Sequence, residues 1–129
     1  MVQAKQRNPD IRLYALPWAW PGWLRNATGG ANPLLDNTAV AAEYVSSWVR
    51  GMKTTHGLTI DFVSIWNEMD ADLEAGSRVY IKALRKALDL KGCGSTKIVA
   101  CDGHSYSDIT KLFVGDPDLV RDVDVLGAH

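Results

Sequence analysis

An amide and a carboxylate close the apolar segment DFVSIWNEMD, residues 61–70. The residues before them are typical of a core, whereas Asn67 and Glu68 are not. A glycosidase acid must be protonated at its working pH, and an apolar neighbour such as Trp66 favours that form of Glu68. Asn67 could donate a hydrogen bond to a sugar 2-hydroxyl, a contact that strengthens at the transition state. The alternative is a solvated carboxylate that begins a loop, and Glu68 alone does not decide between the two.

A second chemical feature is the loop LPWAWPGWL, residues 16–24, which holds three tryptophans and two prolines. Aromatic faces stack on the C–H faces of sugars, and prolines restrict the loop. Trp18 directly follows an apolar run, so we assign it to a site. We interpret Trp20 and Trp23 as a hydrophobic plug, because large aromatic side chains are mostly buried.

Polar residues also follow two later apolar runs, in the tetrapeptide CDGH (101–104) and the tripeptide GAH (127–129). Sites in α/β folds form at the carboxyl ends of the strands. We therefore expect Trp66, Asp102 and His129 to line a pocket beside Glu68, although a structural role suits His129 equally well.

The sequence predicts no metal site and no cofactor. The histidines and the two cysteines lack zinc-ligand spacing. Asp70, Asp72 and Glu74 resemble a calcium loop only loosely, because Gly76 is misplaced and no bidentate glutamate follows, so a solvated acidic loop is preferred.

Four short apolar runs predict strands, and helical patterns separate them. The runs are IRLYAL (11–16), IDFVSIW (60–66), KIVAC (97–101) and VDVLGA (123–128). Helices are predicted from an apolar stripe over residues 40–52, a second over 77–90 and a shorter one over 107–114. Gly92 suits the end of the second helix.

This alternation predicts an α/β fold with a parallel sheet. Both a doubly wound sheet and a (β/α)8 barrel fit the order, but no Gly-rich phosphate loop follows any strand, which weakens the nucleotide-binding version. The 129 residues suffice for one domain at most. The chain stops directly after a strand, which predicts that residues 1–129 are a fragment.

Composition excludes several classes of protein. The formal net charge of −1 gives no reason to expect a nucleic-acid partner. No apolar run is long enough for a transmembrane helix, and the N-terminus lacks the apolar region of a signal peptide. Cys93 and Cys101 are expected to form no disulfide, because a strand would hold them apart. Asn26 opens an N-glycosylation sequon that matters only in a secreted protein.

Five segments together resemble glycoside hydrolase family 59, the galactosylceramidases. They are NPDIRLYALPWAWPGWL, AAEYVSSWVRGMK, IDFVSIWNE, KIVACDG and VDVLGAH, which follow one another over nearly the whole chain. The proline–tryptophan loop and the strand ending in Trp-Asn-Glu are specific in combination, although Asn-Glu alone occurs in many barrel glycosidases.

The resemblance implies a fragment of a (β/α)8 (TIM) barrel, approximately barrel strands three to six. It implies retaining hydrolysis of galactosylceramide, with Glu68 as general acid/base, Asn67 on the sugar and Trp18 lining the galactose pocket. A lysosomal or secreted location and a saposin-type lipid-transfer activator are also implied. No cofactor is implied.

The chain differs from the family pattern in two respects, and two other functions also fit the sequence. The family's nucleophile ends the seventh strand, so the isolated chain is expected to be inactive. The loop around residues 28–33 is longer than the family pattern. A related clan member, such as a family 30 glucosylceramidase or xylanase, would share the Asn-Glu pair. A truncated, non-catalytic glycan-binding protein would bind galactosides without hydrolysis.

Overall fold

The computed structural model describes residues 1–27, 37–68, 74–103, 111 and 113–128. Helices and strands alternate over most of this length. In chain order they are α1 (Val2–Arg7), β1 (Tyr14–Ala15), α2 (Gly22–Ala27), α4 (Thr38–His56), β2 (Phe62–Ser64), α5 (Glu74–Leu90), β3 (Lys97–Gly103), α7 (Pro117–Asp122) and β4 (Val125–Ala128).

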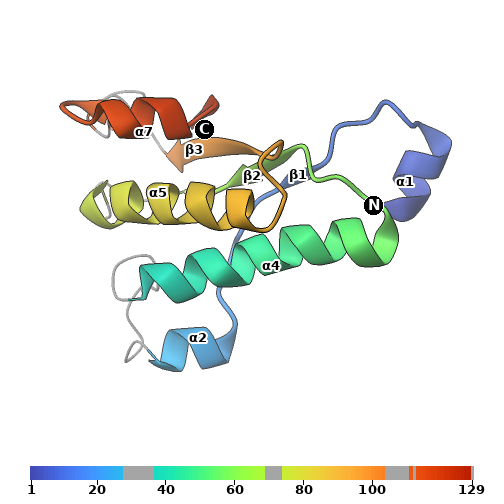
Figure 1. The fold of residues 1–129 in the computed structure, drawn as a ribbon, viewed down its shortest axis with the longest axis horizontal. Coiled ribbons are helices and arrows are strands. Elements are labelled where there is room, and N and C mark those ends of the chain that lie inside the picture. The colour runs from blue at the N-terminus through green and yellow to red at the C-terminus, as the bar shows by residue number, and fades with distance from the viewer. Residues whose placement is uncertain (28–36, 69–73, 104–110, 112, 129) are drawn as a thin grey trace.

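The four strands form one parallel sheet in the order β1-β2-β3-β4. A doubly wound sheet reverses its strand order at a switch point, whereas a barrel adds each strand beside the preceding one. Right-handed crossovers that all advance in one direction place their helices on one face of the sheet. The arrangement is therefore an arc of a (β/α)8 barrel, as predicted (Figure 1).

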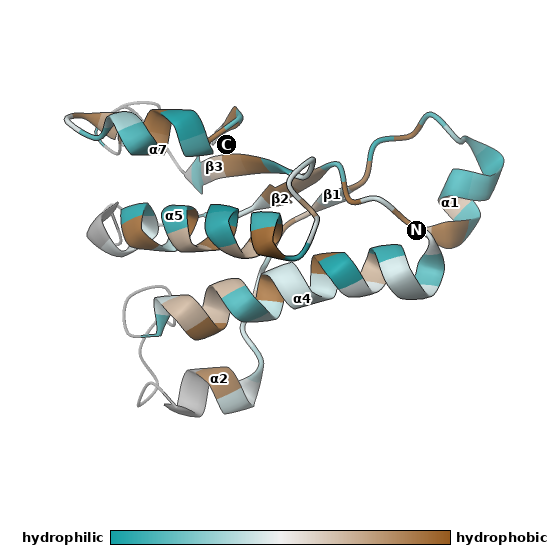
Figure 2. Cartoon of the chain, viewed as in Figure 1, coloured by the Kyte–Doolittle hydropathy of each residue, from teal (hydrophilic) through white to brown (hydrophobic). Residues whose placement is uncertain are grey.

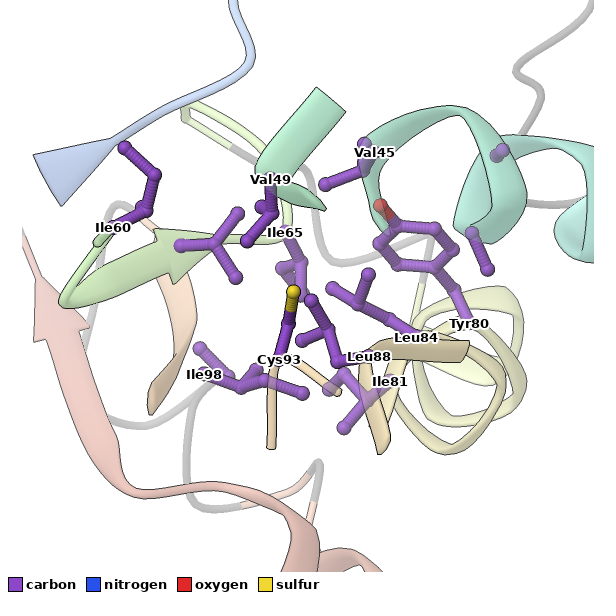
Figure 3. Close-up of a cluster of buried hydrophobic side chains, with 14 of the residues drawn as sticks. Val45, Val49, Ile60, Ile65, Tyr80, Ile81, Leu84, Leu88, Cys93 and Ile98 are labelled. Atoms are coloured by element: carbon purple, nitrogen blue, oxygen red, sulfur yellow. The ribbon is translucent and has the colours of Figure 1, made fainter. Parts of the chain in front are cut away.

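The hydrophobic core lies between the sheet and the pair α4 and α5, as Figure 3 shows in close-up. Val45 and Val49 enter it from α4, and Leu84 and Leu88 enter it from α5. The strands contribute Val63, Ile98 and Ala100, and Ile65 follows β2. In Figure 2 the strands are largely hydrophobic, whereas hydrophobic and hydrophilic residues alternate along α4 and α5.

The two long helices lie close to their predicted positions. α5 begins at Glu74, three residues before the predicted start. α4 ends at His56 and is capped by Gly57, whose φ of 64° is the left-handed conformation that glycine adopts without strain. Its N–H donates back to carbonyls of the last helical turn.

Three short helices were not predicted, namely α1, α2 and α7. α7 has a clear start signal, because Asp116 caps the N–H of Leu119 at 3.1 Å and Pro117 occupies the first turn. The helix predicted over 107–114 lies mostly outside the described residues.

Within the described part of the chain, no helix combines the length and the apolar character that crossing a membrane requires. Cys93 is buried and carries a free thiol.

Candidate active site

Backbone hydrogen bonds join the carboxyl ends of the first three strands. The Asn67 N–H donates to the Pro17 carbonyl at 3.0 Å, and the Glu68 N–H donates to the Asp102 carbonyl at 3.0 Å. These bonds bring Trp18, Asn67, Glu68 and Asp102 to the same end of the sheet. Sites in parallel α/β folds form at this end.

Glu68 is exposed, and its backbone is in the left-handed region with φ of 52°. Asp102, which accepts its N–H, has φ of 49°. Non-glycine residues with such angles are uncommon, and each is disfavoured by roughly 1 kcal/mol or more. They persist where the surroundings fix them, and they cluster at functional sites.

The three tryptophans of the loop differ in burial. Trp18 is 72% exposed at the end of β1. Trp20 is buried and stacks on the half-buried Trp66, with centroids 5.5 Å apart and planes at 15°. The plug interpretation is therefore confirmed for Trp20. It is wrong for Trp23, which lies in the first turn of α2, packs edge-to-face with Tyr44 and is 59% exposed.

Asn67 is nearly buried, with 9% of its surface exposed. Its Oδ1 is buried and accepts no hydrogen bond from any of the described residues. An unpaired buried acceptor costs about 1–3 kcal/mol. The amide therefore has unused hydrogen-bonding capacity beside Glu68.

Asp102 is 8% exposed, and its Oδ2 accepts hydrogen bonds from the hydroxyls of Tyr14 and Ser64. The hydroxyls come from β1 and β2, so one carboxylate oxygen joins three strands. Burial, and then the bond to Asp102, raises the pKa of Tyr14 to about 12. The phenol therefore remains a donor at neutral pH.

Sequence reasoning missed Tyr14 and Ser64. A signal was available, because both place a hydroxyl inside an otherwise apolar run, and buried hydroxyls almost always have a partner. Tyr14 pairs with Phe62, and Ser64 lies two residues further along β2. The period of two places both side chains on one face of the sheet.

Gly127 on β4 lies next to the Asp102 carboxylate. A Cβ added there would overlap Oδ1 of Asp102 and would lie 3.0 Å from both its Cγ and Cγ1 of Val99. The lack of a side chain at position 127 leaves the space that the Asp102 carboxylate occupies.

A hollow of about 260 Å³ lies next to the carboxyl end of β1. Residues 15–20 line one side, and Tyr44, Val45 and Trp48 of α4 line the other. Trp18 lines this hollow, whereas Asn67, Glu68 and Asp102 do not.

Several other residues that the sequence analysis named are not described, or are described only in part. His129 and His104 are outside the described residues, and so are Asp70 and Asp72. Asn26 lies in α2, but its side chain is not described. Over the part of the chain that the structure does describe, no three His, Cys, Asp or Glu residues gather closely enough to hold a metal ion.

The chain is similar to known glycosyl hydrolases along its whole length. The profile of glycosyl hydrolase family 59 matches residues 1–129. The galactocerebrosidases of Salmo salar and Mus musculus are each 43% identical to the chain over 129 residues, and that of Homo sapiens is 41% identical. The match covers the whole chain but only 18% of the length of each of these relatives.

Proposed function

Because the chain belongs to glycosyl hydrolase family 59, we propose that it forms part of the catalytic barrel of a retaining β-galactosidase that acts on galactosylceramide. The observation that carries this proposal is the position of Glu68. It is an exposed carboxylate at the carboxyl end of a central barrel strand, tied to the ends of both neighbouring strands through its own N–H and that of Asn67. The family match sets aside the family 30 alternative.

Glu68 would protonate the glycosidic oxygen and then activate the water that releases galactose, the two tasks of the acid/base in a retaining enzyme. Asn67 would hydrogen-bond the sugar 2-hydroxyl, and its amide oxygen has no partner among the described residues, which is compatible with this role. Trp18 would offer its exposed ring to the galactose C–H face. Trp66 and His129 remain predicted pocket residues, whereas both oxygens of the Asp102 carboxylate already face Tyr14, Ser64 and Gly127.

Retaining hydrolysis needs a second carboxyl about 5–5.5 Å from the first. The resemblance assigns this nucleophile to the end of the seventh barrel strand, and the four strands here would be strands three to six. The nucleophile is therefore proposed to lie outside residues 1–129.

The substrate and the setting follow from the same relatives. The vertebrate relatives are galactocerebrosidases, which supports a galactolipid substrate for this chain. We extend to this chain the lysosomal or secreted location and the saposin-type activator that the resemblance implies. In a secreted protein the Asn26 sequon would also be available for glycosylation.

The experiment uses a hybrid protein, in which residues 1–129 replace the matching segment of the Mus musculus galactocerebrosidase. Residue numbers remain those of this sequence. Glu68→Gln keeps the shape of the side chain but removes the ionisable group. General acid/base catalysis contributes about 100- to 10,000-fold, so galactosylceramide hydrolysis should fall by at least 100-fold.

Glu43→Gln is the matched control. Glu43 is an exposed carboxylate of α4 that pairs with Lys91 at 2.7 Å, and neither residue takes part in the backbone hydrogen bonds of Asn67, Glu68 and Asp102 at the strand ends. A surface pair contributes less than about 1 kcal/mol, so this variant should keep full activity. Full activity of Glu68→Gln would refute the proposed role of Glu68.

A further inference from the structure

The left-handed backbone at Glu68 is hydrogen-bonded to the left-handed backbone at Asp102. The link is the 3.0 Å hydrogen bond from the Glu68 N–H to the Asp102 carbonyl. A peptide carbonyl moves with its own residue. The direction in which the Glu68 side chain leaves the strand therefore depends on what fixes Asp102.

Residues of all three other strands contact or border the Asp102 carboxylate. Tyr14 of β1 and Ser64 of β2 donate to Oδ2. Gly127 of β4 leaves room for Oδ1, where any larger residue would displace the carboxylate. Asp102 itself lies on β3, where the pairing with β4 shifts register between Cys101 and Gly103.

We propose that Asp102 is a positioning residue for the general acid/base. The buried carboxylate holds its own peptide in the left-handed conformation, and the carbonyl of that peptide holds the Glu68 backbone. This inference rests on the proposed function of Glu68. It assigns Asp102 a different task from lining the substrate pocket.

The arrangement suits support better than contact with substrate. One carboxylate oxygen already accepts two hydroxyls, and the other faces Gly127. A general acid must come within about 2.6–3.2 Å of the oxygen that it protonates. A misplacement of about 1 Å can lower the rate about 100-fold. A residue that fixes the backbone position of Glu68 would therefore raise the rate of hydrolysis.

The test compares two substrates in the hybrid protein. Galactosylceramide has an alkyl leaving group that needs protonation, whereas 2,4-dinitrophenyl galactoside has a leaving group that departs without it. Asp102→Asn should lower kcat/KM for galactosylceramide about tenfold or more. It should leave kcat/KM for the dinitrophenyl substrate within about twofold. A purely structural defect would lower both values equally, because it removes folded protein.

Tyr14→Phe is the second variant, for the case in which Asp102→Asn does not fold. It removes one of the two hydroxyls and should show the same selective loss at about threefold. Its matched control is Tyr80→Phe, because the buried Tyr80 hydroxyl has no hydrogen-bond partner within the described part of the chain. That control should leave both kcat/KM values unchanged.

Glu68→Gln separates the two proposals. Selective loss in Glu68→Gln and in Asp102→Asn or Tyr14→Phe supports the positioning role. Selective loss in Glu68→Gln alone, with equal or no loss in the other variants, overturns that role and leaves the function of Glu68 standing. No selectivity in Glu68→Gln overturns the proposed function itself.

Discussion

At the scale of single residues, Asp61 joins β2 to the residues before β1. Its Oδ2 accepts the Leu13 N–H at 2.8 Å, and its Oδ1 meets Nη1 of Arg12 at 2.8 Å. The Leu13 N–H first, and then Arg12, lower the pKa of Asp61 below its ordinary 3.8. The charged form is therefore the one that the folded chain stabilises.

Asp61→Asn should lower the free energy of unfolding of the hybrid protein by about 1–2 kcal/mol at pH 7, because it weakens hydrogen bonds to a charged acceptor. A carboxyl whose pKa is depressed by folding stabilises above its unfolded pKa and loses this effect as pH falls through the folded pKa. The difference between wild type and variant should therefore shrink between pH 5 and about pH 3. Urea unfolding across this range measures it, and a constant difference would contradict the assignment.

At the scale of elements, the same substitution at two glycines of α4 is expected to change the free energy of unfolding in opposite directions. Gly51 lies inside α4, and an added Cβ would meet no atom within 4 Å. Gly57 ends the helix with φ of 64°, where a Cβ is strained even though space is open.

Gly51→Ala should raise the free energy of unfolding by about 0.5–1 kcal/mol, because alanine restricts the unfolded chain and suits a helix interior. Gly57→Ala should lower it by about 1 kcal/mol through left-handed strain. Urea unfolding of the two hybrid variants measures both values. Equal shifts for the pair would show that backbone conformation at position 57 does not decide the effect.

The sequence predicted elements better than it predicted contacts. The apolar runs and stripes located the four strands, α4 and α5, because their burial repeats with a regular period. The short helix α2 was missed because its apolar residues, Trp23 and Leu24, were interpreted as part of a loop. The hydroxyl pair of Tyr14 and Ser64 depends on strand register and on Asp102, which is 88 residues from Tyr14 in the chain. No local pattern encodes that distance.

At the scale of the whole molecule, the sheet has two edges, and an apolar hollow adjoins each. Trp18 and Trp48 border the hollow next to β1. A second hollow, of about 380 Å³, adjoins β4 and is lined by Val125 and Leu126. In a closed barrel the neighbouring strand–helix units would cover both places.

Leu126→Lys should therefore act differently in two settings. Leu126 is 53% exposed in the 129-residue segment. The separate segment should self-associate through its edges, and lysine there should reduce the association seen by sedimentation velocity. In the hybrid protein the same substitution should lower Tm by several degrees. Leu90→Lys, at an exposed residue that ends α5, is the control and should change neither quantity. Unchanged association of Leu126→Lys would exclude the β4 edge as the contact.

The consecutive strand order also has a consequence for how the chain acquires its shape during synthesis. Each strand pairs with the next one to leave the ribosome, so the sheet and its helices can form progressively from the N-terminus. The bond between Tyr14 and Asp102 cannot form until the third strand has emerged and docked. A nascent chain that ends before Asp102 would thus have formed the pairing of β1 with β2 while the turn at Glu68 still lacked its support. The hydrogen bond that supports the Glu68 backbone can therefore form only after β3 has docked.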